Sequence, residues 1–218
     1  MKVCALIRGA GATETSALEN CPVSERMEFS SMQTTKNDTT VYGESEVHGG
    51  LSFQNWVSRE HITVGLQAIV IPLGLRITNV STRDIRLYRP SPEDLIPSFL
   101  TQDGKVVLPN LPVIDLQQKP LTEDAYPIVK PSETQTFQIN AVIFKRDGTV
   151  TLGLHKDAGT GWSFPNLGVG VLKYSLPYSH AWDKVTVYSD TAQKSVELPD
   201  IWTGSINPPR INIVVSTE

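Results

Sequence analysis

The chain has 218 residues and a net charge of −4, and its lysines and arginines are scattered along the sequence. Because a phosphate-binding surface needs clustered positive charge, this distribution disfavours a nucleic-acid partner. No apolar run approaches the roughly 18 residues of a membrane span, so we expect no transmembrane segment. Val, Ile and Thr make up about a quarter of the chain, and such a composition favours strands over helices.

The N-terminal residues 1–50 are predicted to form a polar, partly disordered arm. From residue 9 onward this segment is rich in Ser, Thr, Glu, Asn and Gly and has no sustained apolar period, as is typical of chains that cannot bury a core. One short strand is expected near residues 27–32. The apolar character begins at Leu51, so we place a single β domain at residues 51–218.

The compartment of the protein stays open at this stage. The first apolar stretch, Val3 to Ile7, has five residues, whereas a secretory signal needs an apolar region of about 7–15 residues; a trimmed start could still hide one. Cys4 and Cys21 are the two cysteines of the chain. They are interpreted as free thiols in the arm, with a disulfide in an oxidising compartment as the alternative.

Residues 62–71 form a largely apolar, β-branched run that predicts a buried strand. Pro72 and Gly74 are expected to break it or to introduce a bulge. The segment 79–84 predicts a turn, because Asn, Ser and Asp hydrogen-bond to their own backbone. Ile85 and Leu87 then alternate with polar residues, which predicts the returning strand of a hairpin.

The proline-rich segment 90–131 excludes long central strands, because proline cannot donate to a ladder. We expect a long ordered connection with short edge strands and a tight turn at Asp103-Gly104. Alternation resumes in the strand 134–144, where the inward face is expected to switch at Val142 and Phe144 through a bulge. A hairpin turn follows at residues 146–148.

Further strands are predicted around residues 150–154, 172–178, 185–187, 196–198 and 211–215. About nine or ten strands at this spacing predict an all-β sandwich or barrel. The residues expected in its core are Phe137, Ile139, Leu152, Tyr174, Leu176, Ile211 and Ile213.

Several short segments resemble bacterial immunoglobulin-like domains. They are residues 75–81 (Leu-Arg-Ile-Thr-Asn-Val-Ser), 130–137 (Lys-Pro-Ser-Glu-Thr-Gln-Thr-Phe), 168–174 (Gly-Val-Gly-Val-Leu-Lys-Tyr), and the closing pieces 202–204 and 208–215. The resemblance implies an immunoglobulin-like antiparallel β-sandwich. Domains of this family serve as adhesion modules, accessory domains and proteinase inhibitors, so the fold does not fix the function.

The sequence offers no strong catalytic or metal-binding motif. Its four histidines are far apart, and Gly161-Trp-Ser-Phe-Pro165 departs from the Gly-x-Ser-x-Gly pattern of a nucleophile elbow. We therefore assign no catalytic residue, metal ligand or cofactor. A non-enzymatic binding module with a protein partner is the leading hypothesis. A carbohydrate-binding module on a β-sandwich and a hydrolase with an unrecognised site are the alternatives.

The binding site is predicted from a simple up-and-down strand path, in which two loops meet at one end of the sandwich. These loops carry Tyr178, His180, Trp182 and Trp202, at the end opposite Trp162. Exposed aromatic rings at loop ends supply a large contact area at low entropic cost. In the competing interpretation, Trp182 and Trp202 cap the core and touch each other. A Greek-key path would redistribute the loops.

Overall fold

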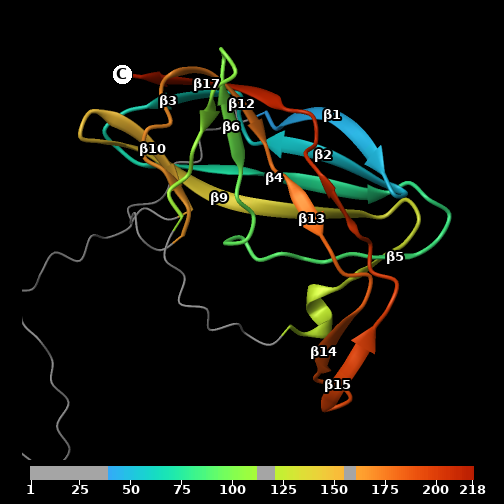
Figure 1. The fold of residues 1–218 in the computed structure, drawn as a ribbon. Coiled ribbons are helices and arrows are strands. Elements are labelled where there is room, and N and C mark those ends of the chain that lie inside the picture. The colour runs from blue at the N-terminus through green and yellow to red at the C-terminus, as the bar shows by residue number, and fades with distance from the viewer. Residues whose placement is uncertain (1–38, 112–120, 155–160) are drawn as a thin grey trace, which may run out of the picture. The chain divides into compact units, whose positions relative to one another are not determined.

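The computed structural model describes residues 39–111, 121–154 and 161–218. These residues form an all-β fold of mainly antiparallel sheets with one short 3-10 helix, η1 (Glu123–Ala125) (Figure 1). The predictions for Cys4, for Cys21 and for a strand near residues 27–32 lie outside the described residues.

The larger sheet has six strands in the order β1-β2-β4-β9-β10-β11 and is antiparallel throughout. Its strands are β1 (Val41–His48), β2 (Leu51–Val57), β4 (Ile69–Asn79), β9 (Thr134–Arg146), β10 (Thr149–Gly153) and β11 (Ser163–Phe164). The turn between β9 and β10 contains Asp147 and Gly148, both at positive φ, which is the geometry that Asp-Gly favours in a two-residue hairpin. The predicted hairpin turn is therefore confirmed.

The second sheet has five strands in the order β3-β17-β12-β6-β7. They are β3 (His61–Val64), β6 (Ser98–Thr101), β7 (Val106–Val107), β12 (Gly170–Ser175) and β17 (Ile211–Thr217). Strands β3 and β17 pair in parallel, and the other pairs are antiparallel. The Asp103-Gly104 turn joins β6 to β7, as the sequence predicts.

The two large sheets share one hydrophobic core. Along β9 and β17 every second side chain is buried and the intervening ones are more exposed, as expected when one face of each sheet is solvated. All seven residues predicted for the core are buried. This arrangement is compatible with a β-sandwich.

Three two-stranded ribbons complete the fold: β5 (Ile85–Arg86) with β8 (Ile128–Val129), β13 (Tyr178–His180) with β16 (Gly204–Ile206), and β14 (Val185–Ser189) with β15 (Lys194–Leu198). The hairpin β14–β15 and η1 lie together at one side of the large sheets (Figure 1). They surround a second, smaller core of Tyr126, Val187, Leu198 and Ile201. We call this part the small lobe.

The ordered strands begin ahead of the predicted boundary at residue 51. Strand β1 occupies residues 41–48, within the segment expected to be an arm, and pairs with β2. Most of its side chains are exposed, so its sequence lacks the apolar alternation that marks a half-buried strand. The main chain of β2 supplies the pairing that the sequence pattern does not indicate.

The predicted long strand at residues 62–71 is wrong, because β3 and β4 divide this run between the two sheets. Strand β4 also continues through Pro72 and Gly74 without the expected break. The Pro72 carbonyl accepts a bond from the Ser58 amide, so the proline nitrogen faces the end of β2, where the ladder stops and a donor is not needed. A Cβ on Gly74 would collide with the Phe137 carbonyl, so glycine permits the close approach of β9.

Three further predictions about strand paths are wrong. Ile85 begins a strand that pairs with β8 instead of returning along β4. The predicted turn before it does form: the Asn79 side chain accepts a hydrogen bond from the Ser81 amide and donates one to the Val129 carbonyl. Strand β9 keeps one face inward as far as Ile143, so no switch occurs. The chain also crosses between sheets instead of following a simple up-and-down path.

Candidate functional site: an aromatic pocket beside His180

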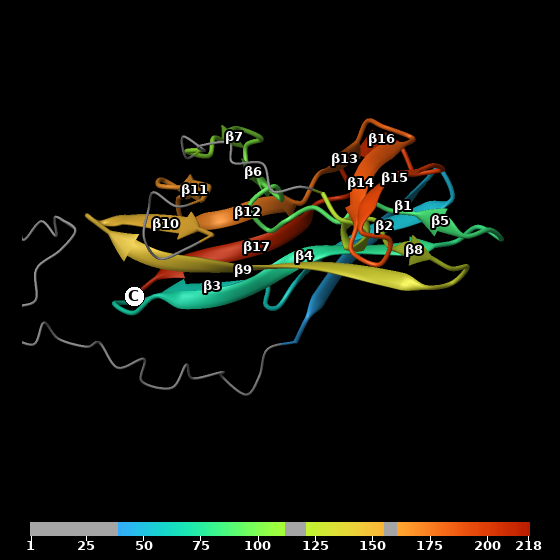
Figure 2. The same ribbon diagram turned by 90° about the horizontal axis from the view of Figure 1, so that it is seen from below.

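The pairing of β13 with β16 brings together the two chain segments that carry the predicted binding residues (Figure 2). Tyr178 lies opposite Ile206, and His180 lies opposite Gly204. Alternation along β13 places the side chains of Tyr178 and His180 on the inner face and Ser179 on the outer face. The register of this short ribbon therefore sets the geometry of the site.

Tyr178 and Trp202 belong to the main core. Their ring centroids are 5.6 Å apart, and both contact the ring of Phe53 in β2, at 5.9 and 5.3 Å respectively. The Tyr178 hydroxyl donates a hydrogen bond of 2.6 Å to the backbone carbonyl of Tyr88, and burial raises the pKa of Tyr178. This half of the predicted cluster packs as an aromatic core.

Two glycines make room for the indole ring of Trp202. A Cβ on Gly49 would lie 2.6 Å from its Nε1, and a Cβ on Gly204 would lie 2.7 Å from its Cη2. The same Nε1 donates to the His48 carbonyl at 3.4 Å, and the His48 ring meets the indole edge at 5.9 Å. The β1–β2 turn and β16 therefore enclose Trp202 from two sides.

His180 is the centre of a second group of rings. Its imidazole stacks on Tyr88 with a centroid distance of 5.0 Å. It meets Tyr126 and Trp182 edge-on, each at 5.8 Å, and the Tyr88 and Tyr126 rings are 5.3 Å apart. His180 is buried, whereas Trp182 is 65% exposed, so the group runs from the interior to solvent.

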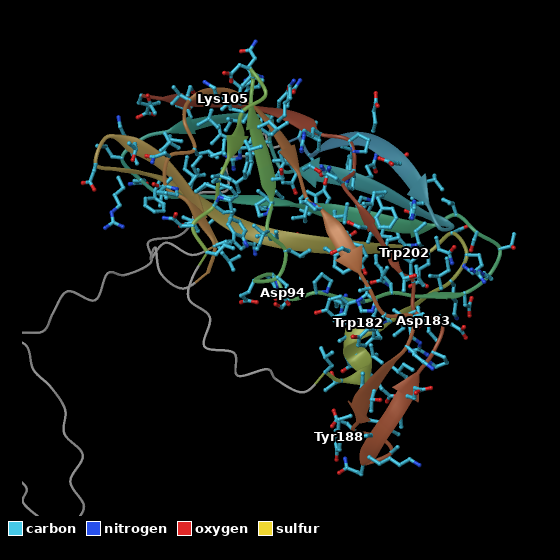
Figure 3. The ribbon with its side chains drawn as sticks, viewed as in Figure 1. Asp94, Lys105, Trp182, Asp183, Tyr188 and Trp202 are labelled. Atoms are coloured by element: carbon cyan, nitrogen blue, oxygen red, sulfur yellow. The ribbon has the colours of Figure 1, made fainter. Side chains whose placement is uncertain are left out.

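These four rings line a hollow of about 600 Å³, which we call the aromatic pocket. Its remaining lining residues are small or uncharged, and three of them carry hydroxyl groups: Ser179, Thr203 and Ser205. Figure 3 shows Trp182 next to the small lobe and Trp202 over the large sheets. The lining contains no Asp, Glu, Lys or Arg, so the pocket is aromatic, hydroxyl-bearing and without an ionised side chain.

The titratable groups of the aromatic pocket are neutral at physiological pH. Burial lowers the pKa of His180, and the nearby backbone of Trp182 offsets part of that shift. Burial also raises the pKa values of Tyr88 and Tyr126, so their hydroxyl groups keep their protons. The buried Nε2 of His180 has no hydrogen-bond partner within the described part of the chain.

The structure divides the four predicted residues between two environments. Tyr178 and Trp202 lie in the core, while His180 and Trp182 line the aromatic pocket. Trp162 is buried elsewhere, against Phe164 and the Pro92 carbonyl. Sequence reasoning missed Tyr88 and Tyr126. Tyr88 lies just before the proline-rich segment 90–131, and Tyr126 lies within it. The only signal was their aromatic type in a segment with few other rings.

Other features of the described residues place no competing site there. A second hollow, of about 420 Å³, lies beside the β6–β7 turn and has no aromatic ring in its lining. Across residues 39–111, 121–154 and 161–218 no three His, Cys, Asp or Glu side chains gather as a metal-binding group. Within the same ranges, no helix has the length and apolarity needed to cross a membrane.

Comparisons with protein-family models, curated proteins and solved structures gave no match.

Proposed function

We propose that this protein is a non-enzymatic binding module of immunoglobulin-like architecture, which holds a protein partner at the aromatic pocket. The observation that carries the proposal is the exposed indole of Trp182 at the mouth of a pocket whose other rings are largely buried. A rigid aromatic ring beside a recessed pocket is a common energetic centre of protein interfaces.

The strand order supports the immunoglobulin-like part of the proposal. In such domains one sheet contains strands A, B and E and the other contains C, F and G. Here β2, β4 and β9 are neighbours in that order, as are β6, β12 and β17, and their chain order also agrees. Strand β10 departs from the pattern: it lies beside β9, where strand D belongs, but it follows β9 in the chain whereas D precedes E. Strands β1, β3, β7 and β11 lie outside these six positions.

The packing around Trp182 supports a binding role at this position. Its ring contact is with His180, and His180 in turn contacts both Tyr88 and Tyr126, whose rings also contact each other. This cluster of mutually contacting rings fixes the base of the pocket, so the protein would lose little conformational entropy when a ligand binds. An isolated exposed tryptophan would lack this support.

A hydrolytic function would need a hydroxyl nucleophile hydrogen-bonded to a base. His180 is the only ring in the aromatic pocket that could act as a base near neutral pH. Its Nε2 has no partner among the described residues, and the serine hydroxyls of the lining make no bond to it. We therefore propose binding in preference to hydrolysis at this pocket.

A carbohydrate ligand is the second candidate, and the combination of rings and hydroxyls favours it. The apolar face of a sugar ring can stack on an exposed indole, and Ser179, Thr203 and Ser205 can exchange hydrogen bonds with its hydroxyl groups. The exposed Trp182 meets the requirement for a solvent-exposed aromatic residue at a loop.

An array experiment tests the proposed function. The full chain, a Trp182→Ala variant and a Tyr42→Ala variant would be labelled and applied to peptide and glycan arrays. Tyr42 is a matched control, because it is an exposed aromatic residue on β1 and lies outside the pocket lining. We expect signals that Trp182→Ala removes and Tyr42→Ala leaves unchanged. Signals that survive Trp182→Ala, or no signal on either array, would refute the proposal.

A further inference from the structure

The charge of the aromatic pocket limits what it can recognise. Its lining contains no ionised side chain, and its histidine and tyrosines are neutral at physiological pH. An ionised ligand group would therefore be desolvated without a countercharge, which is costly. The complementary ligand is uncharged where it contacts the pocket.

The hydrogen-bonding groups of the lining include several donors. The indole N–H of Trp182 is a donor only, and the hydroxyls of Tyr88 and Tyr126 keep their protons and donate as well. The lining contains no Asn, Gln, Asp or Glu, the side chains that would accept several bonds from a polyhydroxylated ligand. A ligand that presents carbonyl acceptors to these donors would pair with them.

The spacing of the rings fits an extended ligand. The centroid of His180 is 5.8 Å from that of Trp182 and 5.0 Å from that of Tyr88. Trp182 and Tyr88 are therefore separated by at most about 11 Å, and one turn of polyproline II, with three residues at about 3.1 Å each, spans about 9 Å. Two prolines three residues apart on such a helix could each reach one of the outer rings.

Proline-rich chains have the chemistry that these three features require. Each proline lacks an N–H donor and presents a carbonyl acceptor and an apolar ring. The polyproline II conformation is already populated before binding, so little entropy is lost, and aromatic-lined grooves are its usual recognition surfaces.

We infer that the aromatic pocket binds an uncharged, proline-rich segment of a partner protein in the polyproline II conformation, with proline rings against Trp182 and Tyr88. This inference rests on the proposed function, since it names the ligand class of the same pocket. The carbonyl groups of the segment would accept bonds from the indole and tyrosine donors.

Isothermal titration calorimetry on the full chain tests this inference with three probes: a synthetic decaproline peptide, a glycine-serine peptide of equal length, and cellohexaose as a neutral oligosaccharide. Each probe is titrated into the unmodified protein and into Trp182→Ala, Trp182→Phe and Tyr42→Ala. Trp182 is largely exposed, so its variants keep the fold, and circular dichroism verifies this.

We expect decaproline to bind and the glycine-serine peptide not to bind. Trp182→Ala should weaken decaproline binding by about tenfold or more, as a central aromatic contact does. Trp182→Phe should lose less, and Tyr42→Ala should leave the affinity unchanged. Equal affinities of decaproline for the unmodified protein and Trp182→Ala would overturn the inference, because the pocket would not be the site.

Two other results would overturn the inference: the first also replaces the proposed protein partner by carbohydrate, and the second leaves the proposed function intact. In the first, cellohexaose binds in a Trp182-dependent manner and decaproline does not, which assigns the pocket to carbohydrate. In the second, decaproline fails to bind and a proline-free peptide from the array binds in a Trp182-dependent manner. Failure of every probe and of every array ligand would overturn both proposals together.

Discussion

Trp202 and Trp182 lie in neighbouring parts of the molecule, yet they have opposite environments. Trp202 is buried, contacts Phe53 and Tyr178, and donates to the His48 carbonyl. Trp182 is exposed, and its ring contact is with His180. One indole completes the core that the two large sheets share, and the other stands at the edge of a pocket beside the small lobe.

The difference shows how one residue type acquires two roles. Glycines at positions 49 and 204 leave a slot into which Trp202 fits, so its burial contributes to stability. Trp182 has no such slot and keeps a free face for a ligand. Tyr178 links the two regions, because its ring lies in the core and its hydroxyl holds the Tyr88 carbonyl at the pocket wall. Four experiments test these assignments.

The largest difference is expected between two truncations. Trp202→Ala should lower the free energy of unfolding by about 3–5 kcal/mol, because it leaves a large cavity between packed rings. Trp182→Ala should change it by less than about 0.5 kcal/mol, as surface substitutions do. Urea denaturation followed by circular dichroism measures both. Equal losses in the two variants would mean that Trp182 is part of the core, and the comparison would fail.

A second experiment separates the faces of β9 within the main core. Ile139→Ala removes a fully buried side chain and should cost roughly 2–5 kcal/mol. Asn140→Ala, one residue further along the same strand, alters an exposed side chain and should cost less than about 0.5 kcal/mol. A loss below about 1 kcal/mol for Ile139→Ala would contradict the burial of this face of β9 in the core.

A smaller effect is expected at the link between the two regions. Tyr178→Phe removes the donor to the Tyr88 carbonyl and should cost about 1 kcal/mol, since the carbonyl loses its partner. Tyr188→Phe is the matched control, because its hydroxyl bonds to Gln193 at the exposed tip of the small lobe. The two free energies come from urea denaturation, and a larger loss for Tyr188→Phe would contradict the link.

The smallest effect concerns the protonation of His180. Its pKa in the fold lies below the ordinary value of 6.5 because of burial. As the pH falls, His180 is therefore protonated in the unfolded chain before it is protonated in the fold. Its contribution to stability is complete above about pH 6.5 and decreases as the pH falls toward its lowered pKa. The rings of Tyr88, Tyr126 and Trp182 that face it do not titrate in this range.

His180→Phe keeps a ring in this position and removes the titration. The urea midpoint of the unmodified protein should therefore fall more steeply between pH 7 and pH 5 than that of the variant. The difference between the two curves is the measured quantity, because every other residue is the same in both proteins. Parallel curves would show that burial of His180 does not control this part of the pH dependence.

Short-range patterns were enough to predict the all-β class and much of the core. Alternation predicted the inward positions Ile139, Tyr174 and Ile213, all of which are buried. The turns at Asp103-Gly104 and Asp147-Gly148 were also predicted correctly. These features depend on the two-residue period of a strand and on turn conformations that few residues adopt, so neighbouring residues determine them.

The pairing of distant strands was decided by the tertiary structure. Residues 62–71 read as one apolar strand, although the chain places β3 beside β17 and β4 between β2 and β9. Strand β1 has mostly exposed side chains and no apolar pattern of its own. Such pairings depend on main-chain hydrogen bonds and packing between residues far apart in the chain, which a local period does not encode.

The same reason governs the candidate site. The sequence by itself identified Tyr178, His180, Trp182 and Trp202 as aromatic or titratable residues in two late segments. It did not determine which tryptophan would be buried, nor that Tyr88 and Tyr126, about ninety and fifty residues earlier, would contact His180. Burial follows from the space that the β13–β16 ribbon, the β1–β2 turn and the small lobe leave between them, and that space exists only in the assembled fold.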